Sequence, residues 1–250
     1  MKRIFALAWA MSLLALIAPT KLAAGDSDPR VPPGTDPGGV AVAVISPGID
    51  YTQPNIAARL ARDGEGEIIG WDFVEDDAFP FAPAGSDGNG TAFASELLAE
   101  APGARLVPIR IDLERPATLL LAIAFINQTP ARVVVLSSDG LRPEHRSAIH
   151  QAASQFDRLL IIMAGDEGRG HTASDVANVL TVGAGVTHGA DQERPFSGEP
   201  NPAQLPRSLA AMVRSTAIAL EIAENEPELD GANLKRAVIA RLASQGSPSR

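Results

Sequence analysis

The chain has 250 residues, a formal net charge of −9 and no cysteine. This length suits one sizeable domain rather than several. The absence of cysteine excludes a disulfide framework, a thiol nucleophile and a zinc–thiolate site. The acidic balance, without any cluster of Lys or Arg, argues against nucleic acid and anionic membrane surfaces as partners.

The first 24 residues have the pattern of a signal peptide. Lys2 and Arg3 precede an uncharged run over residues 4–18, and small residues follow at 23–25. This run is shorter than the roughly 20 residues that a membrane-spanning helix needs. We therefore expect residues 1–24 to be removed on export, leaving a secreted or periplasmic protein without a membrane span. An uncleaved membrane anchor is the alternative interpretation of the same run.

Residues 25–39 are dense in Pro, Gly and Asp and offer almost nothing to bury, which predicts a flexible linker. Beyond this linker, apolar runs alternate with helical patterns. The apolar runs cover residues 40–45, 68–74, 104–111, 132–136, 159–164 and 178–184. Because they are apolar at nearly every position, they are typical of parallel strands buried on both faces.

The helical patterns cover residues 91–99, 116–127, 143–156, 209–224 and 231–244. Strands that alternate with helices predict right-handed crossovers between parallel strands. We therefore expect a doubly wound α/β domain over residues 40–244, with a mostly parallel sheet and helices on both faces. Residues 245–250 are predicted to form a disordered tail.

Short motifs follow the predicted strands, where the functional groups of a doubly wound domain gather. In chain order they are SPGIDYTQPNI, GNGTAFAS, APGARLVPIRI, MAGDEG and SLAAMVRSTAIAL. Taken together, they resemble the motifs of the subtilisin-like serine peptidases. The resemblance extends over residues 40–242 and implies the subtilisin-like fold.

The same resemblance implies where the family's catalytic groups would lie in this chain. Ser46 stands at the position of the family's aspartate, and Asn89 stands at the position of its histidine. Asp166 replaces the asparagine that donates to the oxyanion. Ser208 aligns with the nucleophilic serine, although counting back from a downstream proline places Leu209 there instead.

These substitutions predict that proteolytic activity has been lost. The amide of Asn89 has no nitrogen basic enough to take the serine proton, and Ser46 supplies no charge to stabilise an imidazolium. An ionised Asp166 accepts hydrogen bonds and would repel an oxyanion. We therefore expect a pseudoprotease without cofactor or metal, whose vestigial cleft binds a peptide or protein segment.

Two other classes of function stay open on the sequence alone. One is a weakly active or unusual serine hydrolase that uses Ser208, with His171 close enough in sequence to replace the missing base. The other is a structural or assembly partner of another envelope protein.

Two further patterns carry less weight. The glycines of GSDGNGT suggest a phosphate loop, but the Lys of a Walker A motif is missing. Asp72, Glu75, Asp76 and Asp77 offer oxygen ligands suited to calcium. A solvated acidic loop is the interpretation we favour, so no metal site is predicted.

Overall fold

The computed structural model describes residues 28–83, 85–115, 117–137, 145–163, 176–182 and 207–246. In these ranges six strands form one parallel sheet in the order β2-β3-β1-β4-β5-β6. The strands are β1 (Ala41–Ser46), β2 (Trp71–Asp72), β3 (Arg105–Arg110), β4 (Ala131–Leu136), β5 (Leu159–Met163) and β6 (Val179–Val182). The helices are α1 (Pro54–Ala57), α2 (Gly90–Glu100), α3 (Ala117–Ile126), α4 (His145–Ala153), α5 (Arg207–Asn225) and α6 (Gly231–Gly246).

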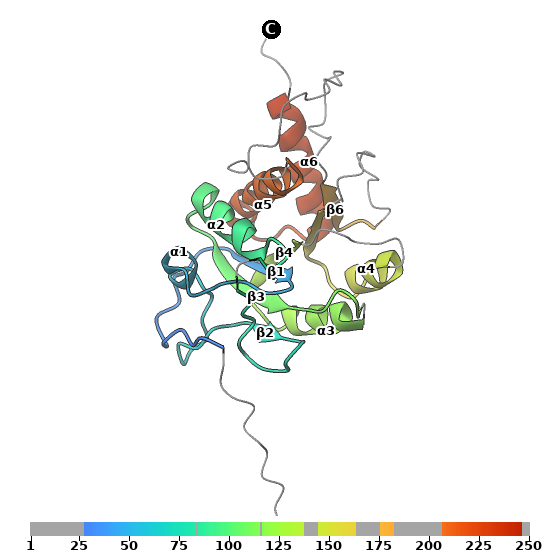
Figure 1. Ribbon diagram of the computed structural model, residues 1–250. Coiled ribbons are helices and arrows are strands. Elements are labelled where there is room, and N and C mark those ends of the chain that lie inside the picture. The colour runs from blue at the N-terminus through green and yellow to red at the C-terminus, as the bar shows by residue number, and fades with distance from the viewer. Residues whose placement is uncertain are drawn as a thin grey trace, which may run out of the picture.

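Helices cover both faces of this sheet. Figure 1 shows α2, α5 and α6 on one side and α3 and α4 on the other. All six residues of β1 are buried, and they alternate between the two cores. Val42 and Val44 pack with Phe93 of α2, whereas Ala43 and Ile45 pack on the side of α3. A strand covered on both faces needs an apolar residue at every position, so the predicted α/β class is confirmed.

The second predicted strand is much shorter than its apolar run. Only Trp71 and Asp72 pair with β3. The earlier part of the run leaves the sheet, because the amide of Ile69 donates to the carbonyl of Ala61 at 2.8 Å. After Asp72 the chain turns back at once, closed by paired backbone hydrogen bonds between Asp72 and Asp77.

Two smaller differences concern helices. The four-residue helix α1 was not expected from the sequence, because so short a helix leaves no periodic pattern. It begins at Pro54, whose fixed φ suits a first helical position. At the other end of the domain, α6 continues to Gly246, so the first two residues of the predicted tail are helical.

Residues 28–39, the described part of the predicted linker, have no regular secondary structure but lie on the domain. We call them the N-terminal strap. Specific hydrogen bonds hold the strap: Tyr51 Oη to the carbonyl of Pro29 (3.0 Å), the amide of Gly34 to the carbonyl of Gly66 (3.0 Å), and the amide of Arg62 to Asp36 Oδ2 (2.8 Å). Composition alone does not reveal these contacts, because their partners come from later parts of the chain.

No helix within the described ranges is both long enough and apolar enough to cross a bilayer.

Candidate active site

The carboxyl end of β1 and the start of α2 meet at the positions that the motifs single out. An ideal Cβ placed on Gly90 would lie 2.4 Å from the carbonyl oxygen of Gly48 and 2.6 Å from Ser46 Oγ. The first turn of α2 therefore rests directly on the loop that follows β1. Ser46 and Asn89, which are 43 positions apart in sequence, lie on two segments in van der Waals contact.

The hydroxyl of Ser46 is occupied by its own loop. Ser46 is fully buried, and its Oγ donates to the carbonyl of Gly48 at 2.8 Å and accepts from the amide of Gly48 at 3.1 Å. A neutral hydroxyl satisfied in this way carries no charge that would orient or stabilise an imidazolium. Ser46 therefore shapes the turn after β1.

Asn89 sits at the N-cap of α2 in the left-handed conformation, with φ 72° and ψ 7°. Among residues other than Gly, Asn is one of the few that adopt this conformation readily. Its side chain does not cap the helix; instead, Asp87 Oδ2 accepts from the amide of Thr91 at 2.9 Å. Asn89 thus sets the direction of the backbone where the preceding turn enters α2, a position we call the hinge. Its side-chain amide cannot act as a general base.

A second contact ties α2 to the loop after β1. The hydroxyl of Thr91 accepts a hydrogen bond from the amide of Asp50 at 2.8 Å. Asp50 and Asp87 both take part in turns through backbone contacts. These contacts give the two carboxylates structural roles in their turns.

The candidate nucleophile lies in the first turn of α5. Ser208 and Leu209 are both 1% exposed. Leu209 belongs to the apolar core that α5 shares with Phe93 and Leu97 of α2. Neither of the two side chains is presented to solvent, whereas a nucleophile must reach its substrate.

Several of the predicted residues fall in other parts of the chain. Asp166 and His171 lie outside the described residues, as does the chain between β6 and α5. The oxyanion position and the replacement base therefore stay predictions. Of the other histidines, His150 lies exposed on α4.

Sequence reasoning missed Arg110, the last residue of β3. Its Nε donates to the carbonyl of Pro47 at 3.0 Å, directly after Ser46. Its Nη1 donates to Asp72 Oδ2 at 2.7 Å and to Glu75 Oε1 at 3.0 Å. The one signal in the sequence was its charge at the carboxyl end of a strand whose four central residues are apolar. Arg110 braces the loop of the candidate site against the loop after β2.

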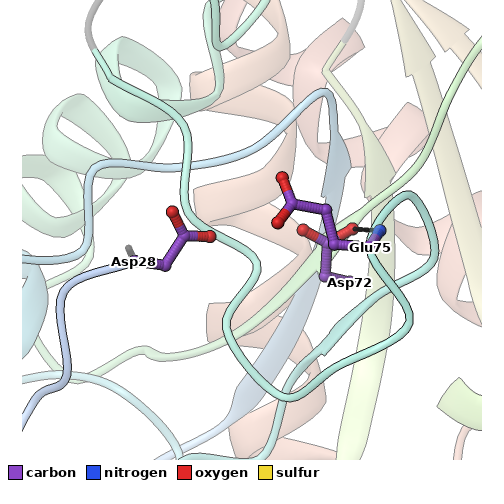
Figure 2. A group of neighbouring side chains, drawn as sticks. All are labelled: Asp28, Asp72 and Glu75. Atoms are coloured by element: carbon purple, nitrogen blue, oxygen red, sulfur yellow. Dashed lines mark hydrogen bonds between the residues drawn. The ribbon is translucent and has the colours of Figure 1, made fainter. Parts of the chain in front are cut away.

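Figure 2 shows three neighbouring carboxylates, and this arginine donates to two of them, those of Asp72 and Glu75. Oxygens of Asp28, Asp72 and Glu75 lie within 4.8 Å of one another. Burial disfavours the charge of Arg110, but the hydrogen bonds that it donates to Asp72 and Glu75 outweigh this effect and raise the pKa of the guanidinium. Because a cation of the protein already pairs with two of the carboxylates, we interpret the group as an ion-pair network and assign no metal to it.

Two cavities of the described structure lie away from this site. One of about 330 Å³ borders Val40 and Ala104, directly before β1 and β3. Another of about 260 Å³ borders Arg132 and Arg158, near the starts of β4 and β5. Both are at the amino ends of the strands, opposite the contact between Ser46 and Gly90.

The chain resembles known proteins in its fold but not in its sequence. No family sequence model matches the chain, and no curated protein sequence matches it either. Solved structures do match. A lanthipeptide protease superposes with a TM-score of 0.54 and 18% identity, over 81% of this chain and 79% of its own. A cold-adapted subtilisin-like serine proteinase superposes with a TM-score of 0.59 and 18% identity, over 86% of this chain and 85% of its own.

These superpositions establish the architecture of the chain. At 18% sequence identity they leave its activity open, because one fold hosts many functions. The parallel six-stranded sheet with helices on both faces agrees with this likeness. The chain therefore has the fold of the subtilisin-like serine proteases, as its motifs predict.

Proposed function

We propose that this protein is a subtilisin-like protease homologue that binds polypeptide without cleaving it. The observation that carries the proposal is the pair Ser46 and Asn89. A buried, locally satisfied hydroxyl and an amide stand where the family places an aspartate and a histidine. Without an ionisable pair at these two positions, neither Ser46 nor Asn89 can take the proton of the serine.

The neighbouring carboxylates do not compensate for this loss. Asp87 is buried, and its Oδ2 already accepts from the amide of Thr91. Asp50 accepts from the backbone of Thr52. Both carboxylates are engaged in holding turns, which supports a structural role for each.

The proposed ligand is an extended segment of polypeptide. Such segments bind folded domains through main-chain hydrogen bonds alongside exposed backbone. The carboxyl ends of the strands, where Ser46 and Asn89 lie, are where doubly wound domains bind ligands. The pattern of residues 1–24 supports a site of action in the periplasm or outside the cell.

A titration with a disordered polypeptide tests this proposal. Fluorescein-labelled β-casein is mixed with residues 25–250, and binding is followed by fluorescence anisotropy. We expect saturable binding, with casein still intact on a gel after prolonged incubation. Asn89→Arg places a long side chain at the hinge and should weaken binding, whereas Gln151→Arg on exposed α4 should not.

Degradation of casein that Ser208→Ala abolishes would contradict the proposal on its catalytic side. Absence of binding, or binding equally strong in Asn89→Arg and the wild type, would contradict it on the side of the ligand. Circular dichroism of each variant excludes misfolding as the reason for a loss.

A further inference from the structure

The N-terminal strap is fastened by two carboxylates in opposite environments. Asp36 is well supplied with donors, because Oδ2 accepts from the amide of Arg62 at 2.8 Å and Oδ1 from the amide of Gly38 at 2.8 Å. Arg105 also pairs with Oδ1. Burial disfavours the charge, but these hydrogen bonds outweigh it and lower the pKa of Asp36. The docked strap therefore favours an ionised Asp36.

Asp28, eight residues earlier, is poorly supplied with hydrogen-bond donors. Its Oδ2 is buried and has no hydrogen-bond partner. The charged groups that face it are Glu75, Arg110, Asp77 and Asp72, three of them negative. Arg110 is already bonded to two of these carboxylates. Burial first, and then the charge of Glu75, raises the pKa of Asp28. Figure 2 shows Asp28 across from the other two carboxylates of the group.

The remaining anchors of this end of the strap keep their charge state. Tyr51 is fully buried and donates to Pro29, next to Asp28. Burial, and then the charge of Asp28, raises the pKa of the Tyr51 hydroxyl, so it stays a donor. Arg30 lies over the ring of Phe79 at 4.9 Å, and arginine side chains stay cationic wherever carboxyl groups titrate. Titration of the strap therefore comes from Asp28 and Asp36.

We propose that the strap is a pH-dependent clasp, which docks most tightly under acidic conditions and loosens as the pH rises toward neutrality. A protonated Asp28 donates a hydrogen bond to a neighbouring carboxylate, whereas an ionised Asp28 meets Glu75 and Asp72 as like charges. When the strap loosens, Tyr51 loses the cover that Pro29 gives it. The same end of the strap, which carries Asp28, moves away from the loop that Arg110 braces.

The direction follows from the two shifts. A carboxyl whose pKa is raised by docking favours docking fully below its ordinary value of 3.8, and this contribution is lost as the pH rises through the raised pKa. A carboxyl whose pKa is lowered favours docking above 3.8, and this contribution is lost as the pH falls through the lowered pKa. Docking is therefore tightest between the lowered pKa of Asp36 and the raised pKa of Asp28.

Hydrogen exchange of the strap tests the clasp directly. The amide of Gly34 donates to Gly66 across the strap, and the amide of Ile111 donates to Ser46 in the core. Protection factors, corrected for intrinsic exchange, are measured from about pH 4 to about pH 8. We expect a several-fold loss of protection at Gly34 toward the upper end, with Ile111 as the reference for global unfolding.

Variants assign the effect to its residue. In Asp28→Asn the Gly34 amide should keep its protection toward neutral pH. In Asp36→Asn the protection of this amide should be low over the whole pH range. Glu65→Gln, which removes an exposed carboxylate outside the group, should behave as the wild type. Equal protection at both ends of the range would overturn the clasp, and so would an unchanged loss in Asp28→Asn. Recovery of protection by calcium chloride, together with a flat pH profile in chelator, would also overturn it, since a cation would then close the strap.

Discussion

Gly90→Ala should destabilise the protein by about 3 kcal/mol, the upper end of the range for overpacking a buried position. The added methyl group would lie 2.4 Å from the carbonyl oxygen of Gly48 and 2.6 Å from Ser46 Oγ. The nearer atom belongs to the backbone, so no side-chain rotation relieves the clash. Either α2 or the loop after β1 must move, and the contact that defines the candidate site opens.

The matched control is Gly64→Ala. A Cβ on Gly64 meets nothing within 4 Å, and Gly64 has no left-handed φ. Its replacement should therefore be neutral or stabilise the fold by less than about 1 kcal/mol. Urea unfolding of both variants, compared at equal m-values, measures the difference. Equal midpoints for the two variants would show that α2 does not rest on Ser46 and Gly48.

Arg110→Met should destabilise the protein by about 3 kcal/mol, the lower end of the range for removing one partner of a buried ion pair. Asp72 is fully buried, whereas the side chain of Arg110 is 20% exposed, which reduces the penalty. Without the guanidinium, Asp72 and Glu75 become unpaired like charges, and the carbonyl of Pro47 loses its donor.

Arg115→Met is the control for this prediction. Arg115 pairs with Asp112, but its side chain is 58% exposed, so removal should cost less than about 1 kcal/mol. Both variants are compared by chemical unfolding near neutral pH. A deficit in Arg110→Met no larger than that in Arg115→Met would mean that the loop after β1 is held without the arginine.

The sequence predicts most of the sheet because burial on both faces leaves a continuous apolar run. β1 and β4 appear within one residue of their predicted bounds for this reason. The run at residues 68–74 predicts too long a strand, since its earlier part pairs with residues 61–62 outside the sheet. A continuous run of apolar residues indicates burial, but it does not distinguish a strand from a buried loop.

For the candidate site, the motifs identify Ser46 and Asn89 but not the contacts that hold them. Asp87 accepts from the amide of Thr91, and Arg110 donates to the carbonyl of Pro47. Both contacts become visible only in the folded chain. The strap is missed for a similar reason. Its residues have the composition of a linker, and the residues that fix it in place, among them Tyr51, Arg62 and Arg105, come later in the sequence.

Labelling with a fluorophosphonate tests the central claim most directly, because this reagent reports whether any serine is activated. Residues 25–250 are treated in parallel with Ser208→Ala and with active subtilisin. In an active subtilisin, removal of the catalytic serine or histidine lowers turnover by about 10⁶-fold, so even a weak catalyst is distinguished from its serine variant. The account predicts that the wild type is labelled no more than Ser208→Ala, while subtilisin is labelled fully. Labelling at Ser208 that the variant abolishes would show that Ser46 and Asn89 have not ended the chemistry, and would contradict it.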